Sequence, residues 1–260
     1  MSSVLVVGDC HVTNGQDLRR FDWLSSLIAD VKPQRIVLIG DFLTMNCLSA
    51  WDMNKRKNME GRRYQLEIEA GKEALNRLLH GMTMLRAKQQ LQKVKMYNPE
   101  LIYIEGNHEE RLTRYLENDP TFEGQVSIES DLRLSDDGWL WVPYRSYYVC
   151  DSVGFTHVPF NKRGPICGAD INKKCADVTI VSCVYGHTHE AHYSNYRRHG
   201  HANLQHILNI GCFFEESHDE DYAEGRIKGY WRGVIMLDLH GDGQFDFTTI
   251  SITKLQEKYK

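Results

Sequence analysis

Two histidines separated by one residue, His187 and His189, follow an apolar run in the segment CVYGHTHEAHY. Imidazole is a common metal ligand, and Gly186 favours a turn that would carry both rings out of the strand. His192, three residues further on, is expected to be a neighbour on the exit loop. The pair alone is equally compatible with ordinary surface histidines, so its meaning depends on what the fold places beside it.

Other side chains of metal-ligand type also stand directly after short apolar runs. The carboxyl ends of strands in α/β sheets form the rim at which ligands bind, so residues placed there are expected to converge. Taken singly, each has an ordinary explanation as a helix cap or a turn residue. Their repetition after successive strands favours a common site. These residues are Asp9, His11, Asp41, Asn107, His108 and His157.

The donor types narrow the choice of metal. Carboxylate, amide and imidazole ligands favour manganese, with iron, zinc, nickel or magnesium as further candidates, over copper(I) or an iron–sulfur cluster. Cys10 lies between Asp9 and His11, and alternation along an extended chain points its side chain away from theirs. Asp41 offers a carboxylate that can bridge two ions. Two adjacent ions would clamp the attacking and leaving oxygens of an in-line phosphoryl displacement.

The order of these motifs resembles the calcineurin-like metallophosphoesterase superfamily. The motifs are GDCH at 8–11, GD at 40–41, GNHE at 106–109, THV at 156–158 and GHTH at 186–189. The resemblance implies an α/β fold, a two-sheet β-sandwich flanked by helices (metallophosphoesterase-like αββα). We expect a single domain over 1–260 with a helical insertion around 52–95. The segments GWLWVPY and GFTHVPFNKRG are similar to members carried by bacteriophages, which implies a bacterial or phage-infected host cytoplasm.

The resemblance also assigns roles. It implies two divalent metal ions and a hydroxide that bridges them and attacks phosphorus. His108 would stabilise the transition state or protonate the leaving oxygen. The second motif reads GDFLTMN, with Thr44 where the family often has a further Asp, and no Arg follows until Arg56. A phosphate dianion needs a cationic clamp, so the missing Arg weakens a protein-phosphatase interpretation. Arg111 can supply such a clamp or be a solvated first-turn side chain. The implied ligands are Asp9, His11, Asp41 and His189 for one metal, and Asp41, Asn107, His157 and His187 for the other.

Short β-branched runs alternate with amphipathic stretches along the first half of the chain, as is typical of α/β proteins. Strands are predicted at VLVVGD, RIVLIGD and ELIYIEG, and a helix over 17–31. The longest helical pattern runs from 59 to about 93, with an expected break near Gly81. Later strands are predicted at SVGFTHV, DVTIVSCV and HILNIGC, and RGVIMLDLHGDGQFDFTTISI is typical of a closing hairpin.

Composition excludes several classes of protein. The 260 residues are 42% hydrophobic with a net charge of -4, which is enough for a full core and does not indicate a polycation. No apolar run approaches membrane length, and MSSVLVVGDC has no signal-peptide pattern, so we expect a cytoplasmic protein without a membrane partner. The seven cysteines include no C-x-x-C pair, which favours reduced thiols over disulfides or zinc fingers.

Two basic segments bear on the substrate. Arg62 and Arg63 follow the second motif, and Arg197 and Arg198 follow the last. Basic residues with interleaved tyrosines suit a phosphodiester backbone and stacked bases, although they also occur on solvated helix faces and hairpins. We therefore expect a metal-dependent phosphodiesterase, a hydrolase acting on DNA, RNA or nucleotides. The alternatives are a phosphomonoesterase acting on protein or small molecules, and a non-catalytic metal-bearing interaction module.

Overall fold

The computed structural model describes residues 2–50, 52, 54–197, 202–216 and 229–260. Its larger sheet has six strands in the order β13-β12-β1-β2-β3-β4. Strands β1 to β4 pair in parallel, and β12 and β13 add antiparallel strands beside β1. The bounds are β1 Ser2–Val7, β2 Arg35–Leu38, β3 Glu100–Ile104, β4 Trp139–Val142, β12 Gly233–Leu239 and β13 Phe245–Ser251.

A second sheet has five strands in the order β10-β11-β9-β6-β5. Strands β6, β9 and β11 are parallel to one another, and β5 and β10 are antiparallel edges. A separate two-stranded pair, β7 with β8, follows β6 along the chain. The bounds are β5 Tyr148–Cys150, β6 Val153–Thr156, β7 Phe160–Asn161, β8 Gly164–Pro165, β9 Ser182–Tyr185, β10 Ala191–Arg197 and β11 Leu204–Ile210.

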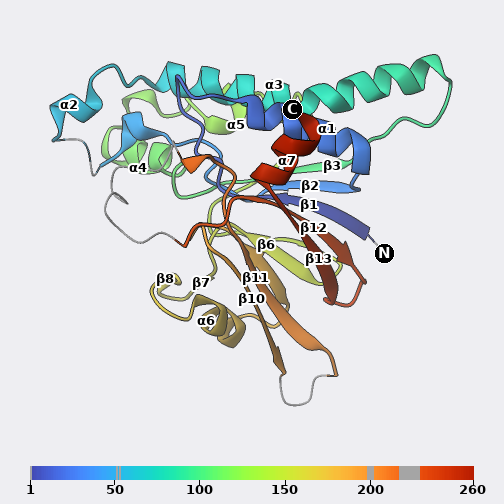
Figure 1. Cartoon of the computed structure of the whole chain (residues 1–260). Helices are drawn as coiled ribbons and strands as arrows, with labels where there is room; N and C mark the ends of the chain where they lie inside the picture. The colour runs from blue at the N-terminus through green and yellow to red at the C-terminus, as the bar shows by residue number, and fades with distance from the viewer. Residues whose placement is uncertain (1, 51, 53, 198–201, 217–228) are drawn as a thin grey trace.

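Helices lie on the outer face of each sheet (Figure 1). Helices α1 (Arg19–Val31), α3 (Tyr64–Leu91) and α7 (Ile252–Tyr259) cover the six-stranded sheet, and α6 (Ile171–Val178) packs on β10 and β11. The shorter helices are η1 Asn46–Leu48, α2 Arg56–Met59, α4 Arg111–Asn118, η2 Pro120–Phe122 and α5 Ile128–Asp131. The structure confirms the predicted α/β architecture of two sheets flanked by helices. No helix in the described ranges is both long and apolar enough to cross a membrane.

Alternation along the strands builds the layers. In β1, Leu5 and Val7 join the core beneath α1 and α3, while Val4 and Val6 face the second sheet. This follows from the two-residue period of a strand, which sends successive side chains to opposite faces. A third, smaller core lies between α6 and the outer face of the second sheet, around Tyr185. The strand ends are therefore held on both sides by packed layers.

Some local predictions were wrong. Helix α3 runs through Gly81 without a break, because Gly81 is a packing position. Its N–H donates to Ser25 Oγ at 2.7 Å, and a Cβ there would lie 2.6 Å from Ser25 O. Asp177 and Val178, predicted to begin a strand, instead end α6. The closing hairpin is confirmed as β12 and β13, but the chain then continues into α7, which was not predicted.

Candidate metal centre

Each residue predicted to bind metal stands on a loop that follows a strand. These strands are parallel within each sheet, so their carboxyl ends reach the same edge. Backbone hydrogen bonds join the loops in pairs: His11 N donates to Asp41 O at 2.9 Å, and Gly186 N donates to His157 O at 3.0 Å. The loops after β1, β2, β3, β6 and β9 together surround one cluster of polar side chains.

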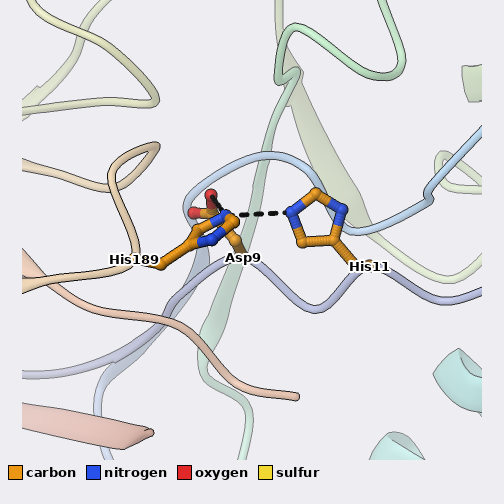
Figure 2. Close-up of side chains that lie close together, drawn as sticks. All are labelled: Asp9, His11 and His189. Atoms are coloured by element: carbon orange, nitrogen blue, oxygen red, sulfur yellow. Dashed lines mark hydrogen bonds and ion pairs between the residues drawn. The ribbon is translucent and has the colours of Figure 1, made fainter. Parts of the chain in front are cut away.

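Asp9, His11 and His189 form the first group of side chains that can hold a metal ion (Figure 2). His189 Nε2 lies 3.1 Å from Asp9 Oδ2 and 3.0 Å from His11 Nε2. All three side chains are buried, with Asp9 fully enclosed. Three donor atoms thus point at one small volume.

Asp41, His157 and His187 form a second group. His157 Nε2 lies 3.2 Å from Asp41 Oδ2 and 2.9 Å from Asn107 Oδ1. A third group joins His11 and Asp41 with His108, whose Nε2 lies 3.9 Å from Asp41 Oδ2. Because Asp41 belongs to the second and third groups, and His11 to the first and third, the three groups form one continuous cluster.

The charges within the cluster balance one another. Burial raises the pKa of the Asp41 carboxyl, but His157 and His108 outweigh burial and hold that pKa well below its usual range. Burial lowers the pKa of His157, but the carboxylates of Asp41 and Asp9 outweigh burial and raise that pKa to about 9. Burial and the neighbouring His157 lower the pKa of His187 to about 4. At neutral pH the metal-free cluster therefore holds ionised carboxylates beside a protonated His157.

The residues present fit a divalent metal ion. His187 Nδ1 is buried and lacks a hydrogen-bond partner within the described residues, which costs free energy until a ligand satisfies it. The Nε2 atoms of His11 and His189 lie 3.0 Å apart. A cation beside them could be bound by the lone pairs of both nitrogens. The donors in all three groups are nitrogen and oxygen, a set that suits first-row divalent ions. Two buried carboxylates also gain from a cation that neutralises them.

The backbone at the cluster is strained. His11, Asp41, His187 and His189 all have positive φ, between 47° and 77°. Non-glycine residues in this region each cost on the order of 1 kcal/mol or more, and such strain gathers at functional sites. The backbone also packs closely here: a Cβ at Gly106 would lie 2.1 Å from Asp41 Oδ1. Holding these side chains together therefore lowers the stability of the folded chain locally.

Glu109 is a buried residue of the site that the sequence pattern did not single out, although it belongs to the GNHE motif. Its carboxylate is fully buried and accepts hydrogen bonds from the backbone N–H groups of Asp41 (3.1 Å), Leu43 (2.8 Å) and Gly106 (2.9 Å), and from Tyr103 OH (3.0 Å). Burial and the charge of Asp41 raise its pKa to about 7. Glu109 thus ties the loop of Asp41 to the loop of Asn107.

His108 is fixed from both sides of its ring. Nδ1 lies 2.8 Å from Thr44 O, and because a carbonyl only accepts, Nδ1 carries the proton. Nε2 then faces Arg111, whose NH2 group lies 3.2 Å away, while Arg111 NH1 donates to Thr44 O at 2.9 Å. Arg111 is therefore held beside the cluster. Thr44, which replaces an expected acid, contributes its backbone carbonyl here.

Phe214 is a second residue of the site that the sequence did not predict. Its ring packs edge-on against His11 and His189, with centroids 5.3 and 5.1 Å away. Phe214 follows the segment LNIGC, whose strand is β11. The contact limits the rotation of both imidazole rings.

The other basic residues predicted to contact substrate are spread out. Arg62 pairs with Asp52 at 2.9 Å, and Arg63 is exposed, its NH1 donating to Arg62 O at 2.7 Å. Arg197 ends β10, about 20 Å along that strand from Ala191. Arg198 lies outside the described residues. A substrate-binding role for these arginines stays a prediction.

Comparisons with known proteins found distant structural matches only. No protein-family model matches the sequence, and no curated protein matches it. Vps29 from Entamoeba histolytica, solved with zinc, is 12% identical with a TM-score of 0.40, covering 96% of this chain and 99% of that chain. Vps29 from Cryptosporidium parvum is 12% identical, with a TM-score of 0.38 and 96% of each chain covered. The nuclease MPE from Pseudomonas putida is 14% identical, with a TM-score of 0.35, covering 95% of this chain and 87% of that one.

Proposed function

We propose that this protein is a metal-dependent phosphoesterase that holds two divalent ions, manganese in the first place, and hydrolyses phosphodiester bonds of nucleic acid or nucleotides. The observation that carries the proposal is the buried cluster itself, in which Asp41 and His11 are each shared between neighbouring groups of ligand atoms. Asp9, His11, Asp41 and His189 would hold one ion. The second ion would be held by Asp41, Asn107, His157 and His187.

Divalent ions in such a site lower the pKa of bound water to near neutrality and polarise phosphoryl oxygens. The chain's own residues supply orientation. His157 Nδ1 lies 3.0 Å from Ile39 O, so the carbonyl fixes Nδ1 as the protonated nitrogen and leaves Nε2 for the metal. His187 N donates to both Asp9 oxygens at 3.1 and 3.2 Å, which orients that carboxylate.

His108 and Arg111 are the residues we place against the substrate. Nε2 of His108 points into the cluster, and in the protonated ring it would donate to the leaving oxygen. The guanidinium of Arg111 lies beside His108, with its NH2 group directed at His108 Nε2. When substrate is bound, that N–H group can donate to a phosphoryl oxygen instead. A diester carries one negative charge and a monoester up to two. Arg62 is paired with Asp52, so Arg111 is the cation that we place against the phosphate. One positive charge matches the single negative charge of a diester better than the two of a monoester.

The test is turnover of bis(4-nitrophenyl) phosphate beside 4-nitrophenyl phosphate by the Mn²⁺-loaded protein. Asp41→Asn is the blank, and Asp246→Asn, an 84% exposed carboxylate, is the matched control. We expect hydrolysis with preference for the diester, retained by Asp246→Asn and lost in Asp41→Asn. Monoester preference would support the phosphomonoesterase alternative. Bound metal without turnover of either ester would support a non-catalytic interaction module.

A further inference from the structure

A cavity of about 370 Å³ opens beside the metal centre. We call it the α6 cavity and define it by His187, Thr188, Asn209, Tyr185 and residues 168–172, which lead into α6 and form its first two positions. His187 belongs both to its wall and to the second ligand group. A molecule whose phosphate lies at the second ligand group would therefore have the cavity directly beside that phosphate. The volume lies within the range of small-molecule sites.

Hydrogen bonds hold two lining residues of the α6 cavity, Tyr185 and Asn172, in place. Tyr185 OH donates to Asn172 Oδ1 at 2.6 Å, and Asn172 Nδ2 donates to the backbone oxygens of His192 and Ile207 at 3.2 and 3.3 Å. Both Tyr185 and Asn172 are buried. Their polar atoms are satisfied by one another and by the backbone, so they shape the cavity and leave recognition to other groups.

Asn209 supplies a hydrogen-bond acceptor. Its side chain is 2% exposed and lines the cavity, and Nδ2 donates to Thr188 Oγ1. That bond orients the amide so that Oδ1 is the remaining polar atom. Oδ1 is buried and lacks a hydrogen-bond partner among the described residues. A buried amide oxygen without a donor is costly, so this position suits an N–H or O–H of a ligand.

The start of α6 supplies donors. The first N–H groups of a helix have no partner inside the helix, and here the preceding residue, Asp170, makes no side-chain capping bond and has φ 57°. These groups can donate to an acceptor that enters the cavity, such as a carbonyl oxygen or a ring nitrogen. Asp170 and Glu190 also line the cavity, and their carboxylates disfavour a second phosphate. The lining therefore selects a neutral group that combines donors and acceptors.

We propose that the α6 cavity binds the nucleobase of the substrate while the attached phosphate lies at the metal centre. A nucleobase is a flat neutral ring with donors and acceptors along its edge. Asn209 Oδ1 accepts from that edge, and the start of α6 donates to it. The proposal rests on the proposed function, since it deepens the identity of the substrate as a nucleotide or nucleic acid.

The test measures affinity, so it does not depend on turnover. Calorimetry on the Mn²⁺-loaded protein compares adenosine, guanosine, cytidine and uridine 5′-monophosphates with ribose 5-phosphate, which has no base. We expect at least one nucleotide to bind at least about tenfold more tightly than ribose 5-phosphate. Ala169→Trp, at an exposed position on the cavity wall, should remove that advantage. Ala202→Trp, at an exposed position outside the cavity, should retain it.

A second variant, Asn209→Leu, keeps the size of the side chain and removes the acceptor, and it should reduce the advantage by a similar factor. If no nucleotide exceeds ribose 5-phosphate by more than about twofold, or if Ala169→Trp leaves the advantage intact, the cavity does not bind the base. Wild-type turnover of bis(4-nitrophenyl) phosphate, which has no base, separates the two proposals. A base advantage without that turnover would support base binding in the α6 cavity and refute the proposed phosphodiesterase function.

Discussion

His157 must lose a proton before it can bind a metal ion, and this links metal affinity to pH. In the metal-free protein its ring is buried, with Nε2 3.2 Å from Asp41 Oδ2 and Nδ1 3.9 Å from Asp9 Oδ1. Burial lowers its pKa, and the two carboxylates outweigh burial and raise the pKa to about 9. Since Nδ1 also faces the carbonyl of Ile39, Nε2 is the atom that must be deprotonated.

The magnitude follows from the shift. A pKa raised from 6.5 to about 9 corresponds to about 3 kcal/mol that favours the protonated ring in the folded, metal-free protein. That stabilisation is fully present below pH 6.5 and is lost as pH rises through 9. Below pH 9, the affinity of a metal that binds the neutral ring should therefore rise about tenfold for each unit by which the pH increases, or about a hundredfold from pH 6 to pH 8.

The assay is calorimetric titration of Mn²⁺ at pH 7 in two buffers of different ionisation enthalpy. We expect release of at least one proton per chain, and an apparent affinity that rises from pH 6 to pH 8. His240→Asn is the matched control, since His240 lies 3.4 Å from the exposed Asp246, and it should leave the proton count unchanged. Metal binding without proton release would falsify the assignment of His157 as a protonated ligand.

Three further predictions concern single side chains of the cluster. Asp41→Asn should reduce the metal content from two ions per chain to at most one by elemental analysis, and retention of two would refute its shared role. His108→Ala should keep both ions and lower kcat about 10²–10⁴-fold, and an unchanged kcat would remove His108 from the mechanism. Glu109→Gln places amide protons against backbone donors and should lower the unfolding free energy of the metal-free protein by about 1–3 kcal/mol in urea titrations at pH 8. The exposed Glu69→Gln is its control, and equal effects of the two would show that Glu109 does not tie the loops.

The positions of the cluster residues were predictable because each follows a strand directly. Strand ends are set by local patterns, and parallel strands bring their carboxyl ends to one edge. Asp41 and His157 are 116 residues apart in sequence, yet they meet because β2 and β6 end at the same edge of the two sheets. The motif order was sufficient to group them.

The features that the sequence did not predict depend on packing between segments that are distant along the chain. Gly81 is typical of a helix break, but in the folded chain it packs against Ser25 and α3 continues through it. Val178 is followed directly by a β-branched run, so the local pattern predicted a strand that begins within the last turn of α6. The acceptor role of Glu109 and the cavity beside Asn209 require the loops to be in place first.

The proposed function requires that one buried cluster hold two metal ions that share Asp41. Anomalous diffraction at the manganese absorption edge, from crystals grown with Mn²⁺, tests it most directly. We predict two peaks per chain, one beside Asp9, His11 and His189 and one beside His157 and His187, both in contact with Asp41. A single peak, peaks elsewhere, or none at saturating Mn²⁺ would refute the shared two-metal site.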